Sequence, residues 1–503
     1  MANDTRHYKI IRGGWVLNPD DRRAGPADIL LDGDCIAEIG PTGKPAPENA
    51  ETIDASDRLL IAGLINAHTH SHGGLAKGSG DRWTLELLLH ASRWISGFRS
   101  VEHTYLSALV GALEMVRKGC TACYDLYLEL PLPTCEGLET IGRAYQDVGM
   151  RAVLAPMLAD YTFYQAIPGL LDALPPAQRR DLEQARMQPA ATTLAACRTL
   201  LQHVPFDPDR IRLALAPTIP LHCSDAFMLA TRDLAQEYGT ALHMHLGESK
   251  IQAMSGITRY GKTLTAHLDA LGLLGPQFTA AHAVWLDHDD IQRLADNGAS
   301  VAHNPGSNLR LGSGIAAIHE MVQAGVNVGI GTDGSSCSDN QNVFEAMRLA
   351  SFVSRLRHHD YHTWLRTDQA LHMATAGGAR ALGFEDLIGR LAPGYKADIV
   401  LLDLNHVNFL PLNDPINQLV HTEDGSAVDS VIINGEVVLW QGRFTRIDIA
   451  SVRSQIDVAV DDLARLSHEA RQLAEALEDH VGQFCMGLAR QPYHVHAMAG
   501  AAY

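Results

Sequence analysis

The sequence predicts an α/β protein, a (β/α)8 TIM-type barrel with a small β-sandwich built from both chain ends. Two observations predict this fold. Short apolar segments alternate with helical segments through the middle of the chain, whereas both ends carry short strands separated by turn signals. We therefore expect a composite sandwich at 1–60 and 390–448, a barrel at 61–389 and a C-terminal helical extension at 449–503.

Length and composition narrow the possible partners. The 503 residues, 46% of them hydrophobic, can bury a core large enough for one barrel and a smaller satellite. A net charge of −18 argues against nucleic acid or an anionic membrane surface as a partner. The sequence holds no apolar run of about 18 residues, and its first residues lack the apolar core of a signal peptide. We expect a cytoplasmic homodimer or higher homo-oligomer that binds neither nucleic acid nor membrane.

Both ends of the chain have the pattern of short strands. Residues 8–60 contain several apolar runs, and Asp32-Gly33-Asp34 is a tight-turn signal between two of them. Residues 397–403 and 428–439 show the same pattern, with Asn434-Gly435 as a hairpin turn. We expect the two ends to pair with each other in the sandwich.

The middle of the chain has the pattern of parallel βα units. Helical stretches, such as 101–118, 226–238 and 288–297, separate the apolar segments, and 451–487 has the pattern of a charged amphipathic helix. The active site of such a barrel lies at the carboxyl ends of its strands. The eight expected strands are 61–67, 120–126, 152–157, 211–217, 241–246, 278–282, 300–303 and 326–332.

Polar residues follow several of these apolar segments. His68 and His70 lie one residue apart, so in a strand both point to the same face, a spacing that suits two imidazoles on one metal ion. With His245 and Asp333 they form a predicted metal site, because three imidazoles and a carboxylate suit Zn²⁺, or Fe²⁺, and leave a position for water. A bound divalent ion lowers the pKa of such a water to roughly 7.

Neighbouring residues fit a hydrolytic reaction at this metal. Glu248 can protonate a ring nitrogen of a substrate, and His282 can hold and orient the hydroxide. Asp333 would take the proton of the water and pass it to a leaving amine.

Five motifs in order resemble the amidohydrolase superfamily, in its branch of metal-dependent aminohydrolases. That branch includes adenosylhomocysteine, guanine and cytosine deaminases and triazine hydrolases such as hydroxyatrazine ethylaminohydrolase. The resemblance implies the metal and catalytic roles given above. Residues 212–222 hold no lysine or acid that could bridge two metals, so we expect a single ion. The motifs are His68-Thr-His70, His243-Met-His245-Leu-Gly-Glu248, His282, His303-Asn-Pro-Gly-Ser-Asn308 and Gly331-Thr-Asp333-Gly334.

These residues predict a hydrolytic deaminase that attacks the amine-bearing carbon of a purine, pterin, pyrimidine or triazine and releases ammonia or an alkylamine. Glu248 favours this reaction, because protonation of a ring nitrogen makes a poor electrophile reactive. Two alternatives stay open. One is a cyclic amide or imide hydrolase, or a dechlorinase, using the same metal; the other is a catalytically inactive binding protein.

The loops predict further substrate contacts. The end of the fourth expected strand has Thr218 and Leu221 where adenosylhomocysteine deaminases have a histidine and a tyrosine, so the nucleoside-reading side of the pocket is altered. For Trp83, packing of its own loop is favoured over stacking on a planar ring, and His303 contacts the substrate or packs in the core. The candidate substrate contacts are Lys77, Trp83, Thr218, His222, His303 and Asp339.

Overall fold

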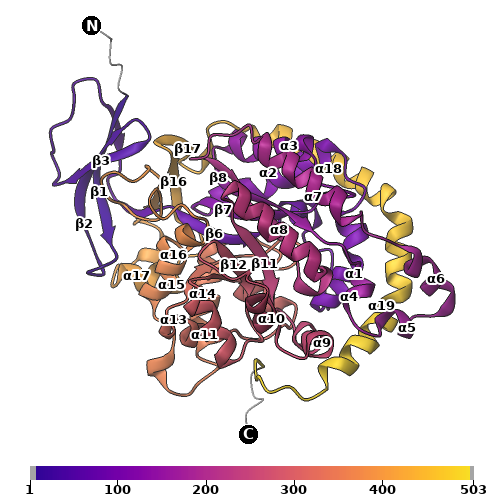
Figure 1. Ribbon diagram of the computed structural model, residues 1–503. Helices are drawn as coiled ribbons and strands as arrows, with labels where there is room; N and C mark the ends of the chain where they lie inside the picture. The colour runs from indigo at the N-terminus through magenta and orange to yellow at the C-terminus, as the bar shows by residue number, and fades with distance from the viewer. Residues whose placement is uncertain (1–6, 499–503) are drawn as a thin grey trace.

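The computed structural model describes residues 7–498, so the outermost residues of the two predicted terminal segments lie outside it. It has the expected α/β class with parallel strands, and a sheet from the chain ends projects from the main body (Figure 1). Within the described range, no helix is both long and apolar enough to cross a membrane.

The two ends of the chain pair in one nine-stranded mixed sheet. β5 is the junction, because it pairs with β1 in parallel and with β15 in antiparallel orientation, placing Ala62 opposite Ile399. The strands of this sheet are β1 (Tyr8–Asn18), β2 (Arg23–Asp32), β3 (Cys35–Gly40), β4 (Glu51–Asp54), β5 (Arg58–Ala62), β15 (Ile399–Asp403), β16 (Val428–Ile433), β17 (Glu436–Trp440) and β18 (Arg443–Phe444).

The central strands form two parallel sheets, in the orders β10-β8-β7-β6, with β9 beside β8, and β11-β12-β13-β14. The sheets meet at two places. The amide of His243 donates to the carbonyl of Leu215 at 3.0 Å, and the amide of Asp333 donates to the carbonyl of His68 at 2.9 Å. The strands are β6 (Leu64–Thr69), β7 (Cys120–Tyr127), β8 (Arg151–Leu158), β9 (Ile211–Leu213), β10 (Ala216–Pro217), β11 (Leu242–Leu246), β12 (Phe278–His282), β13 (Ser300–His303) and β14 (Asn327–Ile330).

The first predicted strand, at 61–67, divides at Gly63. A Cβ at Gly63 would overlap the side chain of Thr121, and the Gly63 amide donates to the Asp398 carbonyl at 2.9 Å. Residues before this glycine therefore belong to the terminal sheet, and those after it begin β6. The apolar run continues through the break, so the pattern alone merges the two strands.

Helices cover the parallel sheets and begin at side-chain caps. Thr84, Ser224 and Asn342, for example, each accept a hydrogen bond from a backbone amide in the first turn of the helix that follows. The longer helices are α1 (Leu85–Ser96), α2 (Val101–Arg117), α3 (Cys135–Val148), α6 (Pro176–Gln184), α7 (Ala190–Gln202), α8 (Asp225–Tyr238), α9 (Lys250–Tyr260), α11 (His288–Asp296) and α14 (Val343–Ser354). The shorter ones are α4 (Phe163–Ala166), α5 (Leu170–Ala173), α10 (Leu264–Ala270), α12 (Pro305–Arg310), α13 (Ile318–Gln323), α15 (Thr367–Met373), α16 (Ala376–Ala381), α17 (Pro415–His421) and the 3₁₀ turns η1 (Ser71–Ala76), η2 (Pro220–His222), η3 (Tyr361–Thr363) and η4 (Val407–Phe409).

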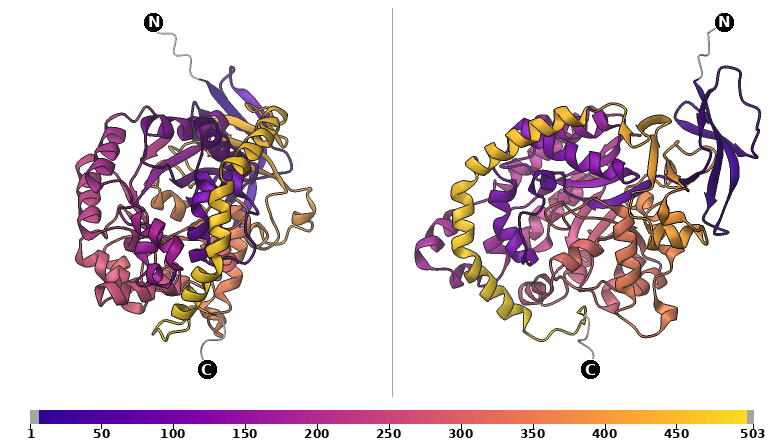
Figure 2. Two further views of the ribbon diagram at one scale, coloured as in Figure 1. Left: turned by 90° about the vertical axis from the view of Figure 1, so that its right-hand side faces the viewer. Right: turned by 180° about the vertical axis from the view of Figure 1, so that it is seen from behind.

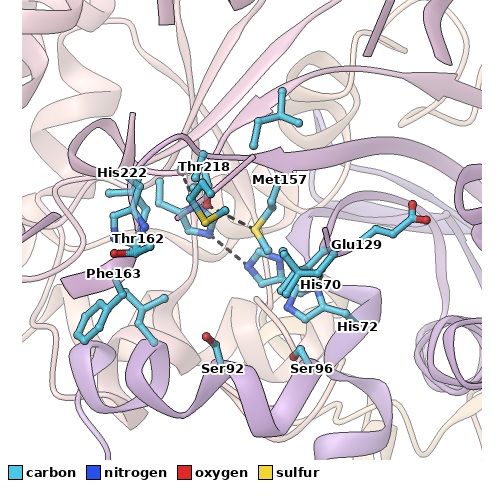
Figure 3. Close-up of a pocket in the computed structure, with 18 of the residues that line it drawn as sticks. His70, His72, Ser92, Ser96, Glu129, Met157, Thr162, Phe163, Thr218 and His222 are labelled. Carbon is cyan, nitrogen blue, oxygen red and sulfur yellow. Dashed lines mark hydrogen bonds between the residues drawn. The ribbon is translucent and has the colours of Figure 1, made fainter. Parts of the chain in front are cut away.

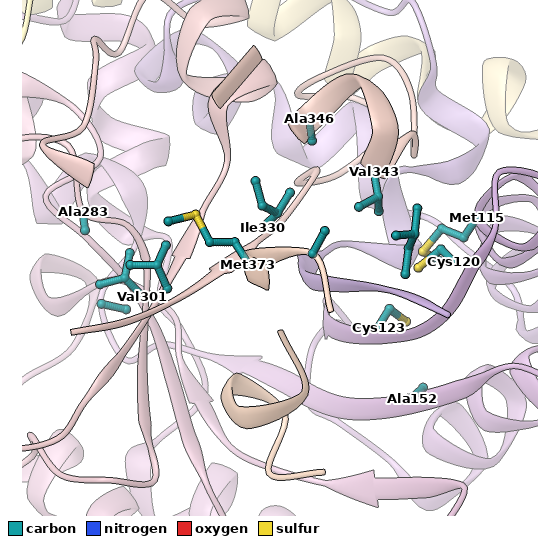
Figure 4. Packing of buried hydrophobic residues seen from close by; sticks show 14 of the residues in the cluster. Met115, Cys120, Cys123, Ala152, Ala283, Val301, Ile330, Val343, Ala346 and Met373 are labelled. Atoms are coloured by element: carbon teal, nitrogen blue, oxygen red, sulfur yellow. The ribbon is translucent and has the colours of Figure 1, made fainter. Parts of the chain in front are cut away.

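The core lies between the parallel strands and these helices. Figure 4 shows side chains of several strands, including Cys120, Val301 and Ile330, gathered near helix residues such as Val343 and Met373. All five side chains are buried. Strands covered on both faces are expected to be nearly continuous apolar runs, which explains why the sequence pattern located them.

The C-terminal segment forms two helices, α18 (Ile449–Leu466) and α19 (His468–Ala489), where the sequence pattern predicted one. They follow the outside of the body (Figure 2). α19 packs against α1, where the His90 ring nitrogen Nε2 lies 2.8 Å from the carbonyl oxygen of Ala474. The extension therefore supports a helix that, as described below, forms one wall of a cavity.

A buried ion pair joins β8 to the terminal sheet. The Arg151 guanidinium lies 3.2 Å from Asp398 and also donates to the side chain of Asn434; both charged groups are almost fully buried. We expect Arg151→Ala to lower the free energy of unfolding by about 3 to 5 kcal/mol, because it leaves the Asp398 carboxylate buried without its cation. Denaturant titration measures this. Arg465→Ala, which removes an exposed pair with Asp462, is the control and should cause a much smaller change.

Candidate functional site

Four of the predicted metal-site side chains converge at the carboxyl ends of β6, β11 and β14. His68, His70 and His245 each offer a ring nitrogen to one group whose ligand atoms lie within 4.8 Å of one another, and His68, His282 and Asp333 form a second such group. The Asp333 Oδ1 atom lies 3.1 Å from Nε2 of His70 and 3.6 Å from Nε2 of His68. The two groups share His68, so they describe one centre.

Backbone carbonyls set the orientation of two imidazoles. Nδ1 of His70 lies 2.6 Å from the Leu126 carbonyl oxygen, and Nδ1 of His245 lies 2.8 Å from that of Thr218. A carbonyl oxygen only accepts, so each Nδ1 carries the proton and each neutral ring directs the lone pair of Nε2 toward the centre. These two Nε2 atoms lie 3.2 Å apart (Figure 3).

A cation between these atoms fits the donor set. Two facing lone pairs repel each other, and the Asp333 carboxylate beside them favours positive charge. Both ring nitrogens of buried His68 also lack a hydrogen-bond partner. Unpartnered buried polar atoms are costly, and a divalent ion bound by three imidazoles and one carboxylate would satisfy one of the two His68 nitrogens.

The charges of this centre affect the pKa values of its members. Burial lowers the pKa of His70, but the bond and charge of Asp333 outweigh this effect and raise it. Burial, together with the nearby rings of His70 and His282, lowers the pKa of His245 to about 3. Burial acts to raise the pKa of Asp333, but the neighbouring histidines and Ser307 lower it by more than burial raises it. The net shift is downward, so Asp333 stays ionised.

Glu248 differs sharply from Asp333. Burial raises its pKa well above the ordinary value, and the carboxylates of Asp333 and Glu86 add to that shift. Its Oε2 atom has no hydrogen-bond partner and lies 3.6 Å from Nε2 of His282. One carboxyl group that stays protonated beside one that stays ionised is the arrangement that acid–base chemistry requires.

Two of these residues have unusual backbone conformations. His282 has φ 71° and Asp333 has φ 64°, in the left-handed region that non-glycine residues seldom adopt. Each such residue costs about 1 to 3 kcal/mol, and such residues are frequent at functional sites. At both residues the backbone turns away from the strand direction, and both side chains lie at the centre. Nε2 of His282 is 3.9 Å from Oδ2 of Asp333.

The centre adjoins a cavity of about 260 Å³. His70, His245, Glu248 and Asp333 line it, so both the candidate metal position and the protonated carboxyl group face the same space. α1 contributes one wall, and Thr218 and His222 lie on another side (Figure 3). Burial and the charge of Arg259 lower the pKa of His222 to about 4, so its imidazole faces the cavity uncharged at neutral pH.

The structure places two of the six predicted substrate contacts, Thr218 and His222, in this cavity and does not bring the other four to it. Lys77 pairs with Glu114, and Trp83 packs against Trp94 with ring centroids 5.9 Å apart, which is the packing role that the sequence left open.

The remaining two predicted contacts also have other neighbours. The Asp339 carboxylate pairs with Arg310 at 2.8 Å and accepts the amide of Gly78, so it holds two loops together. His303 is buried, and neither ring nitrogen has a hydrogen-bond partner. It is not among the residues that line the cavity.

The sequence interpretation missed several supporting residues. The Ser307 hydroxyl donates to Asp333 at 2.6 Å, and the Asn308 amide oxygen lies 2.9 Å from Nδ1 of His282. Both belong to the motif that begins at His303, which was the available signal. Glu86 was also missed; it accepts a bond from Ser249, next to Glu248, at 2.6 Å. Glu86 lies in an otherwise apolar helical stretch and belongs to no motif, so the sequence did not mark it as part of the site.

The fold and the site together define a metal-dependent hydrolase. A model of the amidohydrolase family matches residues 59–438. The chain belongs to the amidohydrolase family and is a hydrolase of carbon–nitrogen bonds.

Relatives of known name span nearly the whole chain. A 5'-deoxyadenosine deaminase of Methanothermobacter thermautotrophicus is 31% identical over 458 residues, covering 90% of this chain and 98% of the relative. A 5-methylthioadenosine/S-adenosylhomocysteine deaminase of Thermococcus onnurineus is 32% identical over 433 residues, covering 86% and 93%.

Solved structures also align with nearly the whole chain. An adenosine deaminase from Xanthomonas campestris with bound zinc aligns with a TM-score of 0.80 and 27% identity, covering 91% of this chain and 98% of that structure. An atrazine chlorohydrolase from Arthrobacter aurescens in complex with zinc aligns with a TM-score of 0.79 and 27% identity, covering 90% and 99%.

Proposed function

We propose that this hydrolase uses one zinc ion, held by His68, His70, His245 and Asp333, to deaminate an adenine-type ring. The observation that carries the proposal is the buried, unpartnered carboxyl group of Glu248, held protonated beside ionised Asp333 in the same cavity. The relatives named for adenosine derivatives and the zinc-containing structures support the ring and the metal. The atrazine chlorohydrolase keeps a triazine as the second candidate ring.

The proposed reaction adds water to the amine-bearing ring carbon and breaks its bond to nitrogen, releasing ammonia and leaving a ring carbonyl. A zinc ion at this centre supplies a water of lowered pKa. Asp333 accepts one proton of the attacking water and delivers it to the leaving amine, while Glu248 donates its proton to the ring nitrogen. The proton that remains on the added oxygen leaves as the ring carbonyl forms and restores Glu248. His282, fixed through Nδ1 by Asn308, orients the attacking oxygen.

The proposal includes the architecture that presents these groups. The contacts between the two parallel sheets support closure of residues 61–389 into a (β/α)8 barrel, with the site at its carboxyl rim. In this proposal the nine-stranded sheet is the composite β-sandwich of residues 1–60 and 390–448. Residues 449–503 are the helical extension, and a cytoplasmic homo-oligomer stays a prediction.

The direct test compares zinc-loaded and chelator-treated protein on a panel of compounds. We expect zinc-dependent ammonia release from 5'-deoxyadenosine or 5'-methylthioadenosine. Release of chloride from a chlorotriazine, or hydrolysis of a cyclic amide, with no ammonia from any aminated ring would contradict the proposal and favour the alternative reactions. Folded protein that binds no zinc would favour a binding protein.

The acid role of Glu248 predicts a pH dependence. Because its pKa is raised, the group donates a proton at neutral pH, and donation is lost as the pH rises through that pKa. Glu86→Gln removes one of the negative charges that raise this pKa. We therefore expect the alkaline fall of kcat/KM to move to lower pH, as measured by pH–rate profiles.

A matched control separates the effect of the Glu86 charge from the effect of removing any carboxylate near the cavity. Glu129 also lines the cavity but does not contribute to the shift of Glu248, so Glu129→Gln should leave the alkaline limb in place. An unchanged or upward-moving limb in Glu86→Gln would rule out Glu248 as the acid.

A further inference from the structure

The cavity extends from the candidate metal centre along an apolar wall. On α1, the side chains of Leu85, Leu88, Leu89 and Ile95 line it. The facing side is formed by the apolar residues Leu128, Leu130, Pro131, Pro133, Met157, Phe163 and Ile219. Whatever part of a substrate extends beyond the reacting ring therefore lies against hydrocarbon, and burying apolar surface there favours binding by about 25 cal/mol per Å².

The charges that face this space are carboxylates. Glu129 lies on the wall in addition to Asp333, and Figure 3 shows Glu129 apart from the histidines. Its carboxyl group accepts the amide and the hydroxyl of Thr134 at 2.9 and 2.6 Å, so it is held in place. The lining in the described range includes no lysine or arginine. An anionic group placed here would lose its water and face like charges.

The polar groups on the wall are uncharged. Ser92 and Ser96, one helical turn apart on α1, point from the helix toward the cavity, and Thr162 and His222 lie across it (Figure 3). Hydroxyls and neutral imidazoles suit hydroxyl groups or ring heteroatoms of a ligand.

We propose, resting on the deaminase function above, that the substrate is an aminated heterocycle with an uncharged, mainly apolar arm, and that the apolar wall of α1 excludes an arm carrying an amino acid or a phosphate. Among compounds with the same adenine ring, the site would thus select those with a short alkyl or alkylthio arm. The wall residues, Leu89 among them, determine specificity and have no part in the chemical step.

The test uses a pair of compounds whose arms have the same carbon chain. 5'-Butylthioadenosine and S-adenosylhomocysteine share the ring, the sugar, the sulfur and an arm of the same length, and differ in the ammonium and carboxylate at its end. On zinc-loaded full-length protein we expect calorimetry and deamination rates to favour the butylthio compound, by roughly 10²-fold in kcat/KM, about 2.8 kcal/mol. Equal or tighter binding of S-adenosylhomocysteine, or binding of neither compound, would overturn the inference.

Binding distinguishes this inference from the proposed reaction. If the butylthio compound binds preferentially but is not deaminated, the reaction is wrong and the selectivity stands. Leu89→Arg adds a cation to the wall, with Leu89→Gln as its uncharged control. We expect Leu89→Arg to reduce the preference for the butylthio compound at least about 5-fold, because the new charge pairs with the carboxylate of the S-adenosylhomocysteine arm. Leu89→Gln should leave this preference unchanged. Equal effects of both variants would show that charge does not set the selectivity.

Discussion

Replacing Glu248 with glutamine should lower kcat by roughly 10² to 10⁴ while the protein keeps its zinc, because the amide matches the carboxyl group in shape but cannot donate the same proton. Glu248 belongs to neither group of side chains that could hold the ion. Steady-state rates and metal analysis on the same preparation measure the two effects. Its unpartnered Oε2 atom means that no structural bond is lost there.

A half-buried glutamate provides the control for Glu248→Gln. Glu320 of α13 pairs with His358 at 3.0 Å and lies outside the cavity lining. Glu320→Gln should leave kcat within about two-fold of the original value, since surface and peripheral substitutions act mainly on stability. Near-full activity in Glu248→Gln would mean that another group protonates the ring.

Replacing His245 with alanine should abolish both zinc binding and turnover. The ring of His245 is one of three imidazoles at the centre, and losing even an outer partner of a ligand costs about 10- to 100-fold in metal affinity. In the original protein, zinc at 100 times its Kd should stabilise the fold by about 2.7 kcal/mol. Thermal unfolding with and without zinc should show this stabilisation in the original protein and not in the variant.

An exposed histidine tests whether the loss is specific. His203, at the end of α7, bonds only to the Thr199 carbonyl among the described contacts of its side chain. His203→Ala should keep the zinc-dependent rise in the unfolding temperature. A His245→Ala protein that binds one zinc ion with unchanged affinity would show that the ion lies elsewhere.

The sequence predicted the parts of the fold that repeat a simple pattern. Buried parallel strands are apolar on both faces, so their positions could be found to within a few residues. The break at Gly63 could not, because it depends on Thr121, which is distant in sequence. The division of the C-terminal helix at Ser467 was also missed, since the charged amphipathic pattern runs through it.

The candidate centre was predictable because its residues follow strands whose ends meet. His70, His245 and Asp333 come together as that rule requires. Loop residues obey no such rule, so Lys77 and Asp339 were expected at the cavity and lie in ion pairs elsewhere. The walls of the cavity come from helices and loops whose docking depends on the whole fold.

The pairing of β5 with β15 has a consequence for synthesis. About 340 residues separate these partners, so at roughly 5 to 20 residues per second the ribosome needs on the order of 20 to 70 s to supply the second after the first has emerged. During that interval one edge of β5 exposes unpaired amide and carbonyl groups to solvent. The nascent chain is therefore most vulnerable to aggregation at its earliest segment, and chaperone binding during translation should be concentrated there.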